Sequence, residues 1–213
     1  MSGVAGRGRG LADLLDSSAM RTRILRGAAL AFSDNGVRDC SVEQILRAAG
    51  VSRRTFYQSF RSRDDVLMSL FEFAIGVTLD AVRAAGAADD PPPDRLRAGI
   101  RAYMAVQRLG APLGAVLQAE AIRPESPLAD KRREVIDEFA RLLAAGMDAA
   151  GGDIDPLFFR ALVVAAEGLM IEALAVDGFD DARAARLEGL LVALFSRALF
   201  ATDGVPPLPR TQA

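Results

Sequence analysis

The twenty residues from Ser41 to Phe60, SVEQILRAAGVSRRTFYQSF, contain the start and stop signals of two short helices. Ser41 is a good N-cap, and Gln44 three positions later completes a capping box that satisfies two free backbone amides. Gly50 is the residue best able to take the left-handed conformation that ends a helix. Ser52 is a second N-cap candidate. The segment therefore predicts two helices joined by a tight turn.

The second of these helices has one apolar and one polar face. Phe56 and Phe60 are four residues apart, so they lie on one side of the helix and anchor it to a core. Two columns of polar residues, each pair also four apart, point away from the phenylalanines: Arg53 with Tyr57, and Arg54 with Gln58. An exposed face of this composition fits the major groove of DNA, as in a helix-turn-helix.

Further elements flank this segment in a recognisable order. They are Ile24 to Gly36 (ILRGAALAFSDNG), Ser41 to Ala49, Ala49-Gly50-Val51-Ser52, Thr55-Phe56-Tyr57, Phe60 and Arg63-Asp64-Asp65. Over about fifty residues, this order and spacing resemble the DNA-binding region of the tetracycline-repressor (TetR) family of bacterial transcription regulators. The resemblance implies an all-α fold of nine helices, with a three-helix head and a helical body that binds a ligand and dimerises through its last two helices.

The chain departs from the family pattern at three positions. Arg54 stands where the family often has glycine or another small residue, and it adds a cation able to make a bidentate contact with guanine. Ser59 replaces a frequent histidine, so a phosphate meets only one neutral hydroxyl there. Arg63 replaces the usual lysine and presents a fork in place of a point charge. We therefore expect Arg54 to set the operator preference of this chain.

The polar positions of the two helices divide into base-reading and phosphate-binding candidates. Glu43 is placed to read a cytosine at the edge of the groove. The predicted base-reading residues are Arg53, Arg54, Tyr57 and Glu43, and the predicted phosphate contacts are Ser41, Thr55, Gln58 and Arg63.

Charge is divided unevenly along the chain. Residues 1–63 contain eleven arginines and five acidic residues, a net charge of +6, whereas the remainder carries fifteen basic and twenty-three acidic residues, a net charge of −8. A basic head is attracted to the phosphate backbone while an acidic body is repelled, which orients the molecule on DNA. The same charge also suits a sequence-nonspecific architectural DNA-binding protein, which we keep as the alternative function.

The composition argues against an enzyme, a metal protein and a membrane protein. Alanine and leucine dominate, and β-branched and aromatic residues are too sparse for a sheet. The chain has no histidine and one cysteine, Cys40, so we expect no metal site and no cofactor. An enzyme that uses the C-terminal pocket is therefore the least favoured of the alternative functions. No window approaches the ~20 apolar residues of a membrane span. A cytoplasmic protein is expected.

Caps and helix breakers divide the chain into four parts: a flexible basic arm (1–18), the helix-turn-helix domain (19–65), the ligand-binding and dimerisation domain (66–205) and a loose tail (206–213). The arm either contacts DNA or is a solvated tail. The predicted helices cover about 19–33, 41–49, a segment from 52, 62–85, 94–109, 111–122, 127–150, 155–176 and 180–201.

The last two predicted helices are apolar on more than one face. A helix that is apolar all round must be covered on every side, and a second copy of the chain covers the extra face most economically. The alternative is that both helices are core of a monomer. The predicted dimer interface consists of Leu187, Leu190, Leu191, Leu194 and Phe195.

Several polar or bulky residues in the predicted body are candidates to line a pocket for a small-molecule effector. Each of them also has an ordinary explanation as a solvent-facing or core residue. Glu167, if buried, needs Arg160, a group of another subunit or a cationic ligand as its partner. The candidates are Tyr103, Gln107, Gln118, Glu167, Met170 and Phe159. Together with the head, they predict a ligand-responsive homodimeric regulator, a repressor that binds a pseudo-palindromic DNA operator.

Overall fold

The computed structural model describes residues 11–87, 89–147, 154–175 and 179–200 of the 213-residue chain. These residues divide into two compact units, a head that ends at Leu70 and a body that starts at Phe71. The prediction of an all-α, nine-helix fold is confirmed for the described residues. The helices are α1 (Leu11–Asp39), α2 (Val42–Ala49), α3 (Arg53–Ser59), α4 (Arg63–Arg83), α5 (Pro92–Leu109), α6 (Ala111–Ala121), α7 (Ala129–Met147), α8 (Pro156–Ala175) and α9 (Asp181–Phe200).

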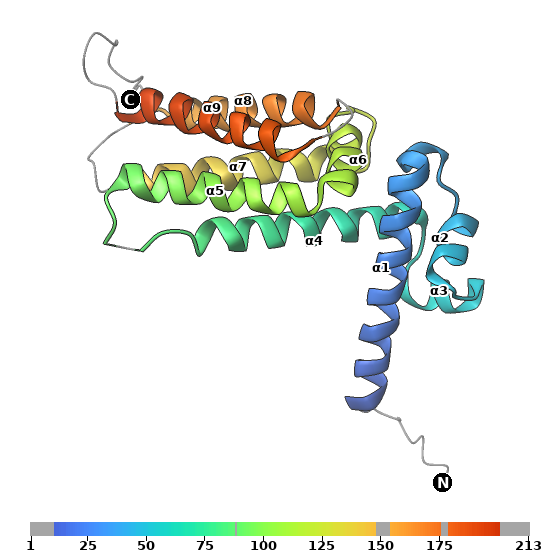
Figure 1. Ribbon diagram of the computed structural model, residues 1–213. Coiled ribbons are helices and arrows are strands. Elements are labelled where there is room, and N and C mark those ends of the chain that lie inside the picture. The colour runs from blue at the N-terminus through green and yellow to red at the C-terminus, as the bar shows by residue number, and fades with distance from the viewer. Residues whose placement is uncertain (1–10, 88, 148–153, 176–178, 201–213) are drawn as a thin grey trace. The chain divides into compact units, whose positions relative to one another are not determined.

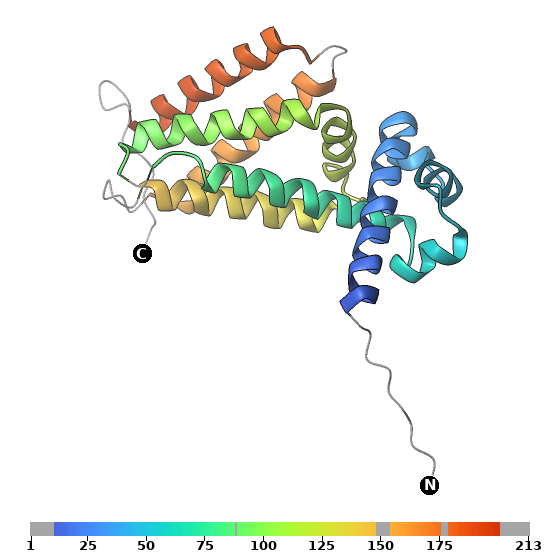
Figure 2. The same cartoon turned by 60° about the horizontal axis from the view of Figure 1, so that its bottom comes forward.

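The head consists of α1, α2, α3 and the first residues of α4. In both views α2 and α3 lie on the same side of α1 (Figures 1 and 2). The three helices enclose an apolar core, as the spacing of apolar residues in the sequence predicts. Its fully buried side chains include Ile24, Ala28, Phe32, Ile45, Phe56 and Phe60.

The helix ends inside the head follow the predicted capping signals. Ser41 and Gln44 form the complete capping box, and Gly50 adopts the left-handed conformation with φ 62° and ψ 41°. The amide of Val51 donates to the carbonyl of Leu46 at 3.1 Å, which closes the end of α2. The Oγ of Ser52 accepts a hydrogen bond from a backbone amide of the first turn of α3. The predicted helix-turn-helix is therefore confirmed.

The first helix is longer than the sequence predicted. It begins at Leu11 and not near residue 19, and it continues to Asp39 across a non-helical break at Gly36, where φ is 73° and ψ is 164°. Residues 11–18 are thus helical where we expected a flexible arm, because the stretch is rich in leucine and alanine, which favour helix. The rest of the predicted arm, residues 1–10, and the predicted tail, residues 206–213, lie outside the described residues.

A glycine sets how closely α1 and α2 approach. A Cβ atom placed on Gly27 would lie 2.5 Å from the Cβ and the backbone nitrogen of Ala49. Real Cβ atoms do not come that close to another backbone, so a side chain at this position would push the two helices apart. The packing of α2 on α1 therefore requires a glycine at position 27.

The body packs the remainder of α4 with α5 to α9. Figure 1 shows α5 and α7 between α4 on one side and α8 and α9 on the other, and Figure 2 shows α9 beside α5 and α7 beside α4. No described helix combines the length and apolar character needed to cross a bilayer. The buried cluster of the body contains Ile100, Met104, Ala140, Met147, Phe159, Leu162, Met170, Ala184, Leu187, Leu191, Phe195 and Leu199.

Candidate functional site

The polar face of α3 lies on the surface of the head. Phe56 and Phe60 are buried with their ring centroids 5.9 Å apart, so they fix the inner side of the helix. Tyr57 packs edge-on against Phe56 and keeps 49% of its surface exposed. Arg53, Arg54 and Gln58 are exposed beside it. The structure thus brings together the polar columns that the sequence predicted.

The exposed residues of this face differ in whether their side chains already form an ion pair or a hydrogen bond. Arg53 forms an ion pair with Glu43 across the turn, so both predicted base-reading groups are engaged with each other. Arg54 and Gln58 have no side-chain hydrogen bond or ion pair to any residue that the structure describes. Since an exposed ion pair contributes little, Arg53 is released at small cost, while Arg54 needs no release.

Two of the predicted phosphate contacts already take part in helix capping, Ser41 as the N-cap of α2 and Thr55 as a partner of Ser52, the N-cap of α3. The hydroxyl of Ser41 donates to Oε1 of Gln44 at 2.8 Å and accepts from the amide of Gln44 at 3.3 Å. Oγ1 of Thr55 lies 2.8 Å from Oγ of Ser52, and either hydroxyl is the donor. Their hydroxyls therefore serve the ends of α2 and α3 in the first place.

Arg63 is engaged inside the head. Its Nη1 donates to the carbonyls of Val37 at 3.1 Å, Arg38 at 3.3 Å and Cys40 at 3.4 Å. Its Nε and Nη2 donate to Oδ1 of Asp64 at 3.1 and 3.0 Å. The guanidinium thus satisfies free carbonyls at the end of α1 and ties them to the start of α4.

Two further arginines hold the helix-turn-helix, and the sequence analysis missed both. Arg23 donates to the carbonyls of Ala49 at 2.8 Å and Gly50 at 3.0 Å, at the end of α2. Arg21 donates to the carbonyl of Ser59 at 2.9 Å, at the end of α3. Cations suit helix C-termini because the free carbonyls there carry partial negative charge. No local pattern marks these two residues, since their partners are 26 to 38 positions away.

The single cysteine does not form a reactive site. Cys40 is buried, and burial raises the pKa of its thiol above the ordinary value, while the charge of Arg63 lowers it by a smaller amount. A thiol of raised pKa is a poor nucleophile at neutral pH. Among the described residues there is also no cluster of potential metal ligands.

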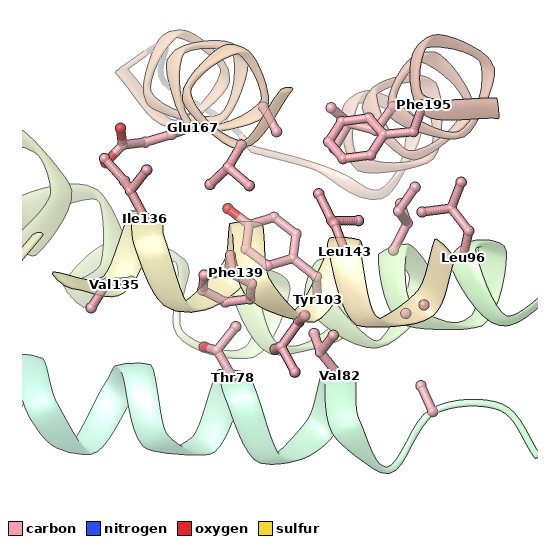
Figure 3. Close-up of a pocket in the computed structure, with 18 of the residues that line it drawn as sticks. Thr78, Val82, Leu96, Tyr103, Val135, Ile136, Phe139, Leu143, Glu167 and Phe195 are labelled. Carbon is pink, nitrogen blue, oxygen red and sulfur yellow. The ribbon is translucent and has the colours of Figure 1, made fainter. Parts of the chain in front are cut away.

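The body encloses a cavity of about 390 Å³ lined by residues of α4 to α9. Its walls are mainly leucine, isoleucine, valine and phenylalanine, and Figure 3 shows these side chains converging on the interior from several helices. Four of the six predicted pocket residues line it, and two, Phe159 and Met170, lie in the buried cluster and not in the lining. The four lining residues are Tyr103, Gln107, Gln118 and Glu167.

Glu167 has a partner that the sequence analysis did not consider. Nε of Arg132, on α7, donates to Oε1 of Glu167 at 2.7 Å, and Nη2 donates to Oε2 at 2.5 Å. Arg160, the partner we considered on the same helix, pairs with Asp137 instead. The side chains of Arg132 and Glu167 are only 25% and 20% exposed, so the cavity wall contains a largely buried, bidentate ion pair.

Neutral hydrogen-bonding groups also line the cavity. Burial, and then the charge of Glu167, raise the pKa of Tyr103 well above its ordinary value, so the phenol stays protonated. Nε2 of Gln118 donates to Oε1 of Gln107 at 3.3 Å. Oε1 of Gln118 is buried without a hydrogen-bond partner among the described residues. A buried acceptor without a donor is energetically costly.

The predicted dimer interface is only partly on the surface. Leu187, Leu191 and Phe195 are buried in the body, and Leu191 and Phe195 line the cavity, so these three predicted interface residues pack within their own subunit. Leu190 is 49% exposed and Leu194 is half-buried. The reason is that α9 has two apolar stripes and the inner one covers its own subunit. The outer face of α8 also carries exposed apolar residues that the sequence analysis did not single out, Leu157, Ala161, Val164, Ala165 and Gly168.

A capped helix-turn-helix with an exposed cationic face, carried by a chain with a helical body around a cavity, is the arrangement found in helix-turn-helix transcription regulators. Residues 24–70 match the model of the bacterial regulatory proteins of the tetR family. None of the curated proteins compared with the chain matches it.

Solved structures of regulators share the fold over most of the chain. A transcriptional regulator from Rhodococcus sp. RHA1 has a TM-score of 0.70 at 17% identity, covering 85% of this chain and 98% of its own. The fatty acid degradation regulator FadR from Bacillus halodurans has a TM-score of 0.68 at 23% identity over 80% of this chain and 97% of its own. The multidrug binding protein EbrR, solved with imidazole, has a TM-score of 0.64 at 24% identity over 86% and 97%. The head of the chain thus matches the tetR family model by sequence, and the described residues share the fold of these solved structures.

Proposed function

We propose that this protein is a homodimeric repressor that binds a pseudo-palindromic operator and leaves it when a small molecule occupies the cavity of the body. The observation that carries the DNA part is the exposed, unpaired Arg54 on a recognition helix whose C-terminal end is held by Arg21, while Arg23 holds the end of the preceding helix α2. A rigid helix that presents free donors is what direct readout in the major groove requires. The repressor role is what the family resemblance implies.

In this proposal the residues of the head have distinct tasks. Arg54 and Tyr57 read base edges directly, and Arg53 joins them when it leaves Glu43. Gln58 contacts phosphate. The hydroxyl of Ser41 remains the cap of α2 and that of Thr55 remains bonded to the cap residue Ser52, and the starts of the two helices approach phosphates. We assign Arg63 to positioning of α1 and α4 in place of phosphate binding, because its donors are already used.

Replacement of Arg54 by alanine is expected to weaken binding to the preferred operator by about 1–3 kcal/mol, the cost of one bidentate base contact. Binding to random DNA of equal length is expected to change much less, because that binding depends on phosphate contacts. The operator is first obtained by selecting bound sequences from random DNA, and both affinities are then measured by gel shift at fixed salt. Equal losses on the two DNAs would show that Arg54 does not read bases. Failure of the selection to enrich any sequence would favour a nonspecific architectural protein.

The dimer is proposed to form through the outer faces of α8 and α9. These faces carry Leu157 and Val164 on α8 and Leu190 on α9, all more than 40% exposed. Contiguous exposed apolar residues on paired helices are typical of a two-fold helix-bundle interface. A dimer is also required to present two recognition helices to the two half-sites.

Leu190→Glu is expected to convert the dimer to a monomer, because the new carboxylate would be buried between two apolar faces. Sedimentation equilibrium measures the mass of the variant. Leu109→Glu is the matched control, since Leu109 is 89% exposed and belongs to α5, which is not part of the proposed interface. A dimer that survives Leu190→Glu, or one that is lost equally in the control, contradicts the proposed interface.

The cavity is the proposed effector site. One structural neighbour is a multidrug binding protein solved with imidazole, which supports a small-molecule role for a cavity of this fold. An apolar cavity with a few polar groups in its wall is the usual form of such a site.

A further inference from the structure

We propose that the effector is an amphiphile whose polar head is uncharged and carries a hydroxyl or similar donor, and whose apolar part extends along α5. The inference rests on the proposed effector role of the cavity and adds the chemistry of the ligand. Three observations carry it: the shape of the lining, the cancellation of charge at the polar end and the unpaired acceptor of Gln118.

The cavity is elongated, with the Arg132–Glu167 pair at one end and two arginines that are bound to other residues, Arg83 and Arg95, toward the other. Lining residues on α5 run over sixteen residues from Pro92 to Gln107, which corresponds to about 22 Å of helix. In Figure 3 the carboxylate of Glu167 lies at one side of the view and Leu96 lies at the other, with Tyr103 between them. A long site with polar groups near one end fits a molecule with a head and an apolar tail.

The ion pair at the polar end of the cavity has no net charge. Arg132 and Glu167 neutralise each other through two hydrogen bonds. A charged head placed there would leave its water shell without gaining an opposite charge, and burying an unpaired ion is costly. The polar end therefore discriminates against both carboxylates and ammonium groups.

The cationic lining residues toward the other end are already engaged. Arg83 pairs with Glu138 on α7. Arg95 donates to the carbonyl of Asp90 at 2.8 Å and to the carbonyl of Gly146 at 3.1 Å. An anionic head would have to replace these contacts, so this end does not favour a carboxylate either.

The head is instead recognised by neutral groups. Oε1 of Gln118 is buried and lacks a donor, and the phenol of Tyr103 stays protonated. A hydroxyl both donates and accepts, so it satisfies Gln118 in either orientation of the amide. A bound alcohol removes the unsatisfied polar atom that the empty wall contains.

The test compares three ten-carbon probes that differ only in the head: 1-decanol, decanoate and decylammonium. Binding to the full-length protein is measured by calorimetry at pH 7. We expect 1-decanol to bind at least about tenfold more tightly than either ion, and Gln118→Leu to weaken 1-decanol by about three- to tenfold, the value of one hydrogen bond. Tighter binding of either ion by the native protein, or no binding of any probe, overturns the inference.

Variants of Arg132 and Glu167 test the same inference by changing the charge of the cavity wall. Glu167→Gln leaves the charge of Arg132 unpaired and is expected to make decanoate the tightest probe. Arg132→Met leaves the carboxylate and is expected to favour decylammonium. The double variant is expected to prefer 1-decanol again, which separates a change of charge from a loss of folding. An unchanged order of probes in both single variants overturns the inference.

Release of the selected operator is recorded in parallel. Probes that bind in the expected order but never release the operator contradict the proposed effector role and leave the chemistry of the cavity intact. Release of the operator by decanoate or decylammonium but not by 1-decanol supports the effector role and overturns the inference about the head.

Discussion

Gly27→Ala is expected to lower the free energy of unfolding of the head by about 3 kcal/mol, the upper end of the usual cost of overpacking. The new methyl group would stand 2.5 Å from backbone and Cβ atoms of Ala49, and a backbone cannot yield as the tip of a flexible side chain does. The helices α1 and α2 would have to separate, and the recognition helix would lose part of its support. Urea unfolding followed by circular dichroism measures the change.

Gly76→Ala is the matched control for this prediction. Gly76 is also inside a helix, but a Cβ atom placed there meets nothing within 4 Å. Because alanine favours helix over glycine, the control is expected to gain up to about 1 kcal/mol. A Gly27→Ala protein as stable as the native protein would show that the two helices are not held at the distance described.

Arg132→Met is expected to destabilise the body by about 3 kcal/mol, since it leaves the carboxylate of Glu167 largely buried without its partner. The double variant Arg132→Met with Glu167→Gln is expected to recover most of this loss, because no unpaired charge remains. Thermal unfolding of the native protein, both single variants and the double variant gives the coupling between the two residues. Additive losses would show that the pair is not coupled.

A second ion pair between α7 and α8 provides the control. Arg160 and Asp137 join the same two helices, but their side chains are 33% and 52% exposed. An exposed pair of this kind contributes about 1 kcal/mol or less, so Arg160→Met is expected to have a small effect. The comparison isolates burial as the cause of the difference.

What the sequence predicted well was determined by neighbours along the chain. The capping box at Ser41, the left-handed Gly50 and the cap at Ser52 each depend on residues within a few positions. The start of α1 near Leu11 was missed because an arm of small residues was assumed to continue to residue 18. Local signals thus predicted the helix-turn-helix in detail and the rest of the head in outline.

Features that depend on distant residues could not be predicted in the same way. The carbonyl partners of Arg21, Arg23 and Arg63 lie 23 to 38 positions away, so the composition alone counted these residues simply as positive charge. The partner of Glu167 lies on another helix for the same reason. Tyr103 and Gln118 were found because they are polar in apolar helices, whereas nothing in the sequence separates a core methionine from one that lines a cavity.

The two apolar stripes of α9 illustrate a third limit. Periodicity shows that both stripes need cover, but it does not show which one faces the subunit's own core. The structure places Leu187, Leu191 and Phe195 inward and Leu190 outward. Only the packing of α5 and α8 around the helix decides between them.

The arginines of the head fall into two groups, those that hold the helices together and those that are free at the surface. Arg21, Arg23 and Arg63 bind carbonyls at the ends of three helices, whereas Arg54 forms no side-chain hydrogen bond or ion pair with any residue that the structure describes. A substitution at position 54 therefore alters what the helix presents while the framework around it stays folded. Descendants of such a chain can acquire new target sites through a few surface changes, without compensating mutations in the core.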